Sequence, residues 1–491
     1  MIDSIKQLQV ANSFAQLPAA FYTSLPPQPL SRPRLLHANI DVARMLGLSE
    51  AALAEPGFLD VVSGAQPLPG GKTLAAVYSG HQFGVWAGQL GDGRAHLLGE
   101  VAGPAGDWEL QLKGSGRTPY SRMGDGRAVL RSSVREYLAG EAMAGLGIPT
   151  TRALALVVSD DPVYRETVET AAIVTRVSPS FVRFGSFEHW SSSPDKLRAL
   201  LDYVVERFYP ECREAGGGEA GAGHDVVLRF LRAVVLRTAD LVAHWQTAGF
   251  CHGVMNTDNM SILGLTIDYG PYGFMDGFQV NHVCNHSDSQ GRYAWNAQPS
   301  VAHWNLYRLA SSLLGLGVDA EALKGELAHF EPAFLQTYRS NLCKKLGLSQ
   351  WQPGDAELVD DWWALLHTQR ADFTLSFRAL ATAPRQAEAL LDGFEDRAAA
   401  QAWLDRYTQR LAQEGRPEAQ RIAQMNRANP LYVLRNHLAQ GAIAAAQRGD
   451  AGEIDTLLKL LRDPYTEQVG YEAYAAKPPE SARHLEVSCS S

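Results

Sequence analysis

Apolar and polar positions divide the chain into a first part with short apolar runs and a second part with helical spacing. Between residues 76 and 186, the short apolar runs alternate with glycine clusters, which is typical of strands joined by tight turns. After Trp190, apolar residues recur every three or four positions over long stretches, which is the spacing of amphipathic helices. The pattern therefore predicts a strand-rich first part followed by a mostly helical second part.

The same spacing locates the expected elements. In the first part, strands are expected over 108–113, 154–158 and 171–175, and a helix over 129–144. In the second part, helices are expected over 197–208, 226–248, 359–366, 398–411 and 454–461. Residues 1–75 show only weak periodicity, and the glycine-rich segment 215–223 is expected to be a surface loop. The tail after Pro464 is expected to be extended or partly ordered, and no repeat suggests a solenoid.

The composition is that of an ordinary globular protein. Of 491 residues, 46% are hydrophobic and 20% are charged, and this length suits several domains or one large two-lobed enzyme. The net charge of -9 argues against generic nucleic-acid binding. No apolar run approaches the roughly 20 residues that a membrane span needs, and the first residues lack an apolar signal core. We therefore expect a cytoplasmic protein whose partners include neither nucleic acid nor a membrane.

The segment from His252 to Asn259, followed by Asp268-Tyr269-Gly270, is typical of a protein-kinase active site with one part missing. A kinase catalytic loop begins with histidine, carries a catalytic aspartate and ends with a metal-binding asparagine; a metal-binding D-F-G follows. Here Val254 occupies the aspartate position, and a valine cannot accept a proton. The pattern indicates either an inactive kinase or a site that uses ATP in a different way.

Two further roles follow from the oxygen atoms of this segment. Asn259 and Asp268 offer the ligands that Mg²⁺ prefers, although alone they could be two polar residues in a turn. Asp258 is the carboxylate inside the loop. It could orient or deprotonate an attacking hydroxyl, or it could simply hydrogen-bond the loop backbone.

Lys113 ends the expected strand 108–113 and precedes a glycine-rich turn, where its ammonium could face nucleotide phosphates. Glu136 lies on the expected helix 129–144 and could pair with it, as a lysine and a glutamate do in kinases. A solvated strand-end lysine is the alternative. Gly91-Asp92-Gly93-Arg94 precedes Lys113, where a kinase has its glycine-rich loop, but could be a hairpin turn.

Basic residues crowd this region of an otherwise acidic chain, namely Lys113, Arg117, Arg122, Arg127, Arg131 and Arg135. Some of them are expected to form salt bridges on a helix surface, and others could bind phosphate through forked guanidinium donors. Arg176 follows an apolar run, and Arg183 lies between aromatic residues, so each needs a charged partner. That partner is either a nucleotide phosphate or an internal carboxylate.

The chain resembles the selenoprotein O family of protein adenylyltransferases over nearly its whole length. The blocks that carry the resemblance are 112–122, 125–133, 252–259, 268–271, 277–278 and 489–491. Members that contain selenium have selenocysteine as the third residue from the end, where this chain has Cys489.

The resemblance implies an α+β, protein-kinase-like bilobal fold. The N-terminal extension and strand-rich nucleotide-binding lobe would span 1–186, and the mostly helical, extended lobe 187–491. It implies transfer of AMP from ATP to Ser, Thr or Tyr hydroxyls of proteins, with Mg²⁺ or Mn²⁺ as cofactor and pyrophosphate as leaving group. ATP would lie inverted, with its α-phosphorus toward the hydroxyl, which gives Val254 a rationale.

The resemblance also implies a role for each matching residue. The nucleotide phosphates would be held by Lys113, Arg176 and Arg183, with Glu136 orienting Lys113. The nucleotide site would be lined by Gly91, Gly93, Arg94, Asp125, Gly126 and Asp268. Asn259 and Asp268 would bind the metal, and Asp258 would accept the proton.

Five cysteines are too few and too scattered for a disulfide scaffold or a zinc site. Cys489 lies in a tail, where its thiol is either available for redox chemistry or inert. The resemblance suggests that Cys284 pairs with Cys489 in a transient regulatory disulfide.

Two other functions stay open beside AMP transfer. One is phosphoryl transfer of the kinase type, and the other is a catalytically inert, ATP-binding pseudokinase scaffold. The position of the label in ATP distinguishes the two transfer reactions. AMP transfer labels the acceptor protein from α-labelled ATP, whereas phosphoryl transfer labels it from γ-labelled ATP. An inert scaffold transfers neither.

Overall fold

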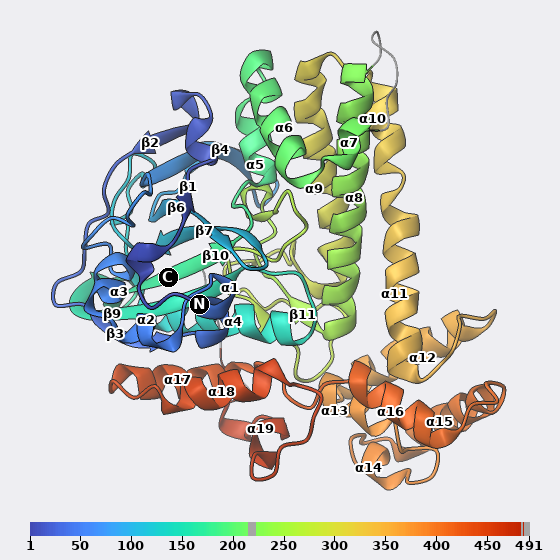
Figure 1. Cartoon of the computed structure of the whole chain (residues 1–491). Coiled ribbons are helices and arrows are strands. Elements are labelled where there is room, and N and C mark those ends of the chain that lie inside the picture. Colours follow the sequence, from blue (N-terminus) through green and yellow to red (C-terminus); the bar gives the residue numbers. More distant parts are fainter. Residues whose placement is uncertain (215–221, 483–484, 486–491) are drawn as a thin grey trace.

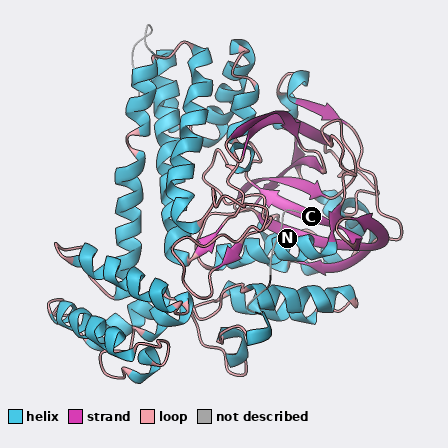
Figure 2. Ribbon diagram, turned by 180° about the vertical axis from the view of Figure 1, so that it is seen from behind, coloured by secondary structure: helices cyan, strands magenta, loops and turns pink. Residues whose placement is uncertain are grey.

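The computed structural model describes residues 1–214, 222–482 and 485. An antiparallel sheet lies beside a group of long upright helices, and a further group of helices lies below both (Figure 1). From behind, the strands and the upright helices again occupy opposite sides of the molecule (Figure 2). The predicted α+β class is confirmed.

Within the described residues, the strands form one ten-stranded sheet and one two-stranded ribbon, with all pairings antiparallel. The sheet has the order β2-β4-β6-β7-β10-β9-β3, with β1 on β6, β5 on β4 and β8 on β10. Its strands are β1 (Val10–Ala11), β2 (Tyr22–Ser24), β3 (Arg34–Ala38), β4 (Leu74–Gln82), β5 (Val85–Gly91), β6 (Ala95–Gly103), β7 (Gly106–Lys113), β8 (Ala128–Val129), β9 (Arg152–Tyr164) and β10 (Val168–Ser178). The ribbon consists of β11 (Phe250–Cys251) and β12 (Gly273–Phe274).

The helices divide into those that cover the sheet, those that stand beside it and those below. Around the sheet are α1 (Ile40–Met45), α2 (Glu50–Ala54), α3 (Pro56–Val62) and α4 (Leu130–Gly145). The next are α5 (Phe184–His189), α6 (Pro194–Phe208), α7 (Glu211–Glu214), α8 (Ala222–Ala248), α9 (Gln298–Leu313), α10 (Ala320–Leu327) and α11 (Phe330–Leu346). The last are α12 (Asp355–Gln369), α13 (Phe373–Ala379), α14 (Glu388–Leu391), α15 (Arg397–Ala412), α16 (Glu418–Ala428), α17 (Asn436–Gln447), α18 (Gly452–Arg462) and α19 (Glu472–Ala475).

The expected elements are present, with longer bounds. The runs 154–158 and 171–175 are the buried middles of β9 and β10, whose outer ends carry exposed residues. Residues 1–75 also contain α1 to α3, of 6, 5 and 7 residues. Helices this short cannot display a full hydrophobic period, but Asn39 and Ser49 cap α1 and α2 with their side chains. The loop expected over 215–223 lies largely outside the described residues.

The sheet register places the residues of interest on one face. Lys113 on β7 lies opposite Val174 on β10, and Arg176 lies opposite Gln111. Because side chains alternate along a strand and opposed residues share a face, Lys113, Val174 and Arg176 point the same way. Val174 packs in the core that includes much of α4, whereas its neighbour Ile173 packs in the core on the other face. The alternating pattern therefore directs both cations toward α4.

The long helix α8 leads directly into the ribbon. It ends at Gly249, whose φ of +68° is the left-handed conformation that favours glycine after a helix. A Cβ there would lie 2.8 Å from the Phe373 ring, so close packing also requires glycine. The paired strands β11 and β12 then enclose the loop 252–272, which carries Asp258, Asn259 and Asp268.

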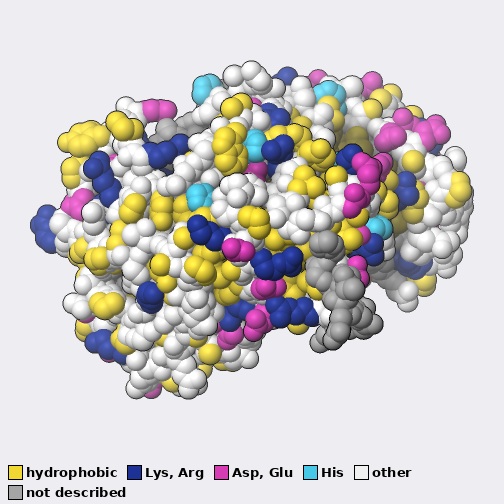
Figure 3. Space-filling view, turned by 90° about the horizontal axis from the view of Figure 1, so that it is seen from above, with side chains coloured by type: hydrophobic (Ala, Val, Ile, Leu, Met, Phe, Trp, Pro, Cys, Tyr) yellow, Lys and Arg dark blue, Asp and Glu magenta, His cyan; other side chains and the backbone are white. Residues whose placement is uncertain are grey.

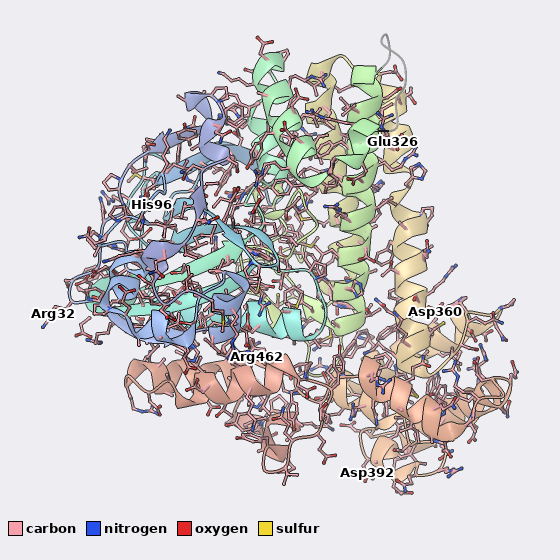
Figure 4. The ribbon with its side chains drawn as sticks, viewed as in Figure 1. Arg32, His96, Glu326, Asp360, Asp392 and Arg462 are labelled. Atoms are coloured by element: carbon pink, nitrogen blue, oxygen red, sulfur yellow. The ribbon has the colours of Figure 1, made fainter. Side chains whose placement is uncertain are left out.

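The last helices return to the sheet side of the molecule. Helices α17 and α18 pack against α4, and Arg462 at the end of α18 points toward α1 and α4 (Figure 4). Its guanidinium pairs with Asp41 at 2.9 Å and donates to Asn39 at 2.7 Å. The predicted lobe boundary at residue 186 falls inside α5, and the division into two lobes stays a prediction.

The surface mixes charges of both signs. On the face seen from above, Lys and Arg side chains are interspersed with Asp and Glu (Figure 3). Over the described residues, none of the helices combines the length and the apolar character needed to span a bilayer.

Candidate active site

A cavity of about 490 Å³ opens between the sheet and the loop 252–272. The nucleotide, metal and proton-acceptor residues expected from the sequence all line it, namely Gly91, Gly93, Arg94, Lys113, Asp125, Gly126, Arg176, Arg183, Asp258, Asn259 and Asp268. Val254, at the position of the missing kinase base, lines it too. Chain segments far apart in the sequence thus meet at one cavity, while the role of each residue stays a prediction.

Five of the buried or half-buried side chains form a continuous chain of ion pairs. Lys113 Nζ lies 2.6 Å from Glu136 Oε2, and the other oxygen of Glu136 accepts from Arg176 Nε. Arg176 Nη2 lies 2.7 Å from Asp268 Oδ1, and Arg183 Nη1 lies 2.5 Å from Asp268 Oδ2. This ion-pair chain holds three cations and two carboxylates, so one positive charge is left in excess at the cavity wall.

The internal carboxylate expected as one alternative partner of Arg176 and Arg183 is therefore Asp268. Burial alone would raise the pKa of Asp268, but Arg176, Arg183 and Lys113 outweigh burial and hold that pKa well below its usual range. Asp268 has a φ of +55°, a left-handed conformation that is uncommon outside glycine. Its replacement by alanine would leave the buried Arg183 without its carboxylate and Arg176 with Glu136 alone.

Lys113 is almost fully buried, and its charge is correspondingly less favourable. Burial lowers the pKa of Lys113 to about 8, with repulsion from Arg176 acting in the same direction and Glu136 opposing both. The ammonium is thus charged at neutral pH and loses its proton in mildly alkaline solution.

Asp258 lies in a 3₁₀ turn (Thr257–Asn259) that also lines the cavity. Its Oδ2 accepts from Gln82 Nε2 at 3.2 Å, and its buried Oδ1 has no hydrogen-bond partner among the described residues. Burial raises the pKa of Asp258 to about 6, while Arg183 and the Gln82 hydrogen bond lower it. At neutral pH this carboxylate is ionised and has an oxygen that can accept a proton.

The tip of β4 and the helix α5 hold this turn in place. His81 N donates to Thr257 Oγ1 at 2.7 Å, and Arg183 Nη1 donates to the Asp258 carbonyl at 2.7 Å. A Cβ at Gly185 on α5 would lie 2.1 Å from the Ser79 carbonyl and 3.3 Å from Asp258 Cα. The turn is therefore closely packed against β4 and α5, with no room for a side chain at Gly185.

The oxygen donors at the cavity suit a hard cation such as Mg²⁺. Asn259 Nδ2 donates to the Val254 carbonyl at 3.0 Å, which leaves its amide oxygen as the ligand atom. Asp268, with its side chain 19% exposed, faces the same cavity. In the described part of the chain, no cluster of three or more His, Cys, Asp or Glu is placed to bind a metal. Nucleotide phosphate oxygens would therefore have to complete the coordination.

Several residues at the cavity were not expected from the sequence. Arg165, on the β9–β10 turn, pairs with Asp125 at 2.7 Å and so fixes the cavity-lining loop that contains Gly126. Gln82 contacts Asp258, as described above. Neither residue type carries a spacing signal, because an arginine in a turn and a glutamine near a strand end are common surface features.

The basic residues of 113–135 divide between the cavity and ordinary contacts. Arg122 and Arg127 line the cavity. Arg131 pairs with Glu169 at 3.0 Å, Arg127 donates to the Gln28 carbonyl at 2.7 Å, and Arg135 stacks on Tyr272. The salt bridge expected for some of these residues is present at Arg131, and phosphate binding by others stays a prediction.

The predicted redox pair is not open to a structural check, because Cys489 lies outside the described residues. Cys284 is not among the residues that line the cavity, and its thiol donates to the Cys251 carbonyl at 3.3 Å. Burial raises the pKa of Cys284 well above its usual range. A thiolate at this position is therefore disfavoured in the present geometry.

Comparison with known proteins identifies the class of enzyme to which this protein belongs. The chain is 68% identical over 493 residues to the protein nucleotidyltransferase YdiU of Bordetella petrii, covering 99% of both chains. It is 68% identical over 494 residues to that of Bordetella avium, covering all of both, and 53% identical to that of Burkholderia multivorans, covering 98% of this chain and 95% of the relative. The protein is an enzyme of the nucleotidyltransferase class. It belongs to the SelO family, whose model, described as "Protein adenylyltransferase SelO", matches residues 4–462.

Proposed function

We propose that this enzyme transfers AMP from ATP to Ser, Thr or Tyr hydroxyls of proteins within a kinase-like two-lobed fold. The observation that carries the proposal is the cavity itself. Its wall holds the ion-pair chain with an excess positive charge, and the ionised carboxylate of Asp258 lines the same cavity. The phosphates of a bound nucleotide would pair with the cations of the ion-pair chain, and the hydroxyl of the acceptor would give its proton to the Asp258 carboxylate.

In the proposed reaction, Asp258 and the cations of the ion-pair chain have separate roles. The acceptor oxygen attacks the α-phosphorus, the bond from that phosphorus to the bridging oxygen breaks, and pyrophosphate leaves. The hydroxyl proton passes to the carboxylate of Asp258, which lines the cavity. Lys113, Arg176 and Arg183 stabilise the charge that develops on the phosphates. These three side chains are largely buried, and the lower dielectric around them strengthens each contact.

A bound Mg²⁺ or Mn²⁺ would further neutralise phosphate charge, held by Asn259 and Asp268. Asp268 already binds two arginines, so its carboxylate would have to be shared between them and the cation. Asn259 has its amide nitrogen occupied by Val254, which fixes the side chain with its oxygen available.

Val254 supports AMP transfer over the kinase reaction. A kinase needs a carboxylate at this position to receive the hydroxyl proton, but the structure has an apolar side chain there and a carboxylate at Asp258 instead. An inverted ATP, with its α-phosphorus nearest Asp258, accounts for this displacement.

The test uses two radioactive forms of ATP with Mg²⁺ and mixed protein acceptors, including the enzyme itself. AMP transfer labels protein from α-³²P-ATP and leaves it unlabelled by γ-³²P-ATP. Intact mass of the labelled enzyme should show adducts of AMP size. Label from the γ-position alone would instead establish the kinase reaction, and label from neither would contradict both. The Asp258→Asn enzyme serves as the matched inactive control.

A further inference from the structure

A second cavity, of about 210 Å³, lies on the side of α8 that leads to the loop 252–272. It is formed where the C-terminal ends of α8, α11 and α16 come together near the start of α13 (Figure 1). None of its lining residues lines the nucleotide cavity. The lining comprises Leu146, Ile148, His244, Thr247, Ala248, Asn341, Lys344, Lys345, Phe373, Thr374, Arg427, Ala428, Pro430 and Tyr465.

The charges around this cavity have one sign. Lys344, Lys345 and Arg427 line it together with His244, and the lining contains no carboxylate. Asp240 is near enough to His244 for an ion pair, at 3.6 Å, but it does not line the cavity.

Lys345 is the unusual member of the set. It is 5% exposed, and its ammonium lies 4.3 Å and 5.5 Å from the ring centroids of Phe377 and Phe373. Its side chain has no ion pair or hydrogen bond within the described part of the chain. Buried lysines are rare unless they are paired, because an uncompensated charge in an apolar site is costly.

Helix ends explain part of this charge. Lys344 and Lys345 lie in the last turn of α11, and Arg427 lies in the last turn of α16, where cations favour the helix dipole. Each helix end carries about half a negative charge, which offsets part of the positive charge of Lys344 and Arg427. Burial lowers the pKa of Lys345 to about 7, so an anion that pairs with its ammonium would favour the protonated form. A positive excess remains, and it suits an anion of one or two charges.

We propose that this cavity is an anion site, which binds a small molecule or ion carrying a phosphate group. Lys345 and Arg427 supply the charge, and Thr374 supplies a hydroxyl group. The Asn341 amide nitrogen is already bonded to His244 and Thr247, so it shapes the cavity wall and is not counted as a donor to the anion. With less than half the volume of the nucleotide cavity, it suits phosphate or pyrophosphate better than a nucleotide.

The position of the site gives it a connection to the active site. Thr247 and Ala248 line the cavity, and the next residue, Gly249, packs against the Phe373 ring that lines it as well. The strand β11 begins immediately afterwards. An anion in this cavity therefore contacts the end of α8 and the Phe373 ring, and the chain continues from the end of α8 into β11 and the loop 252–272.

The experiment measures lysine labelling by reductive methylation and mass spectrometry on the full-length enzyme at pH 7. Inorganic phosphate, pyrophosphate and acetate are added separately, with sodium chloride keeping ionic strength constant. At about ten times the dissociation constant, phosphate should slow labelling of Lys344 about tenfold, because only about a tenth of the sites is free. Lys113 reports separately on the nucleotide cavity, and exposed Lys324 reports on non-specific effects.

Three variants locate the effect. Lys345→Met and Arg427→Met should abolish phosphate protection of Lys344 and leave that of Lys113 unchanged. Arg339→Met, which removes a cation from the same helix away from the cavity, should keep it. Lys345→Met should fold with an unchanged or higher midpoint of thermal unfolding, since it replaces a buried charge by an apolar chain of similar length. Protection of Lys344 that survives in Lys345→Met, or that chloride or acetate reproduces, would overturn the proposal.

Discussion

Asp258 is the residue whose protonation should set the rate of the proposed reaction. Because its pKa is about 6 and the base must be ionised, initial rates should rise as pH increases through about 6 and level above it. Asp258→Asn should lower kcat by about 10²–10⁴ and remove this rise. A pH–rate profile from 5 to 8 measures both, and an unchanged profile in the variant would exclude Asp258 as the base.

Gln82 should tune that pKa without taking part in the chemistry. Its amide donates to the ionised form of Asp258, so Gln82→Leu should raise the Asp258 pKa and move the acidic limb of the profile upward. A hydrogen bond to a charged group is worth about 1.5 kcal/mol, which corresponds to roughly one pH unit. Gln89→Leu, at an exposed position of the neighbouring strand β5, is the control and should leave the limb in place. If the acidic limb of the pH–rate profile moves equally in both variants, the Gln82–Asp258 hydrogen bond is not the cause of the shift.

Lys113 should make nucleotide affinity depend on alkaline pH. Its pKa of about 8 means that the ammonium charge is present below pH 8 and lost above it, so ATP should bind more weakly as pH rises. Loss of one charge-assisted contact costs about 1.5–3 kcal/mol, or roughly a 10- to 100-fold higher Kd. Calorimetric titration of ATP from pH 6.5 to 9.5 tests this. Lys113→Met should bind weakly and lose the pH dependence, whereas Lys72→Met should behave as wild type.

At the scale of single residues, the sequence predicted residue types and one ion pair, Lys113 with Glu136, but it left other partners open. The kinase-like order identified Lys113, Glu136, Asn259 and Asp268, and all lie at or behind one cavity. The sequence left open whether Arg176 and Arg183 meet phosphate or carboxylate, because that depends on a contact between β10 and a loop about 90 residues away, as the Arg176–Asp268 bond shows.

Among the elements, those with long periodic patterns were predictable and those shorter than two turns were not. Helix α8 and strands β7, β9 and β10 follow directly from their apolar spacing, because each buries a defined face. Helices α1 to α3 lack that signal and are stabilised by caps and by packing on the far face of the sheet.

The contact of α5 with the catalytic turn is a test at this scale. Gly185→Ala would place a methyl group against the Ser79 carbonyl, a backbone atom that cannot yield easily. Overpacking of this kind should cost about 1–3 kcal/mol of unfolding free energy and displace Asp258, lowering activity. The matched control is Gly441→Ala in α17, where the added methyl meets nothing within 4 Å and should stabilise by about 0.5–1 kcal/mol. Urea unfolding measures both; equal effects would contradict the packing argument.

Across the whole molecule, one buried arginine joins the catalytic segment to the last helices. Arg435, 1% exposed, precedes α17, bonds both oxygens of Asp372 at the start of α13, and pairs with Asp276 beyond β12. Arg435→Met would leave the buried Asp372 and the half-buried Asp276 without their cation, so we expect a loss of about 3–5 kcal/mol in unfolding free energy. Arg397→Met, which breaks an exposed pair, should change little. Denaturant titration that gives equal midpoints for the two variants would refute this role.

The arrangement of these parts is what the sequence could not supply. The cavity wall draws residues from Tyr78 to Pro271, and α17 and α18 return to α4 after more than 280 residues of intervening chain, as the contact of Arg462 with Asn39 illustrates. Such long-range contacts arise where whole faces of helices and sheets pack together, and they produce no periodic pattern in the local sequence.

The depth of Asp258, which is only 7% exposed, has a consequence for target choice. Under the proposed function, a target hydroxyl has to enter the cavity to share a proton with this carboxylate. Side chains on loops, termini and partly unfolded chains can extend into a cavity more easily than those on a flat, rigid surface, so conformational freedom in the target should matter as much as its local sequence. Nascent or damaged proteins would then be modified more readily than their compact native forms.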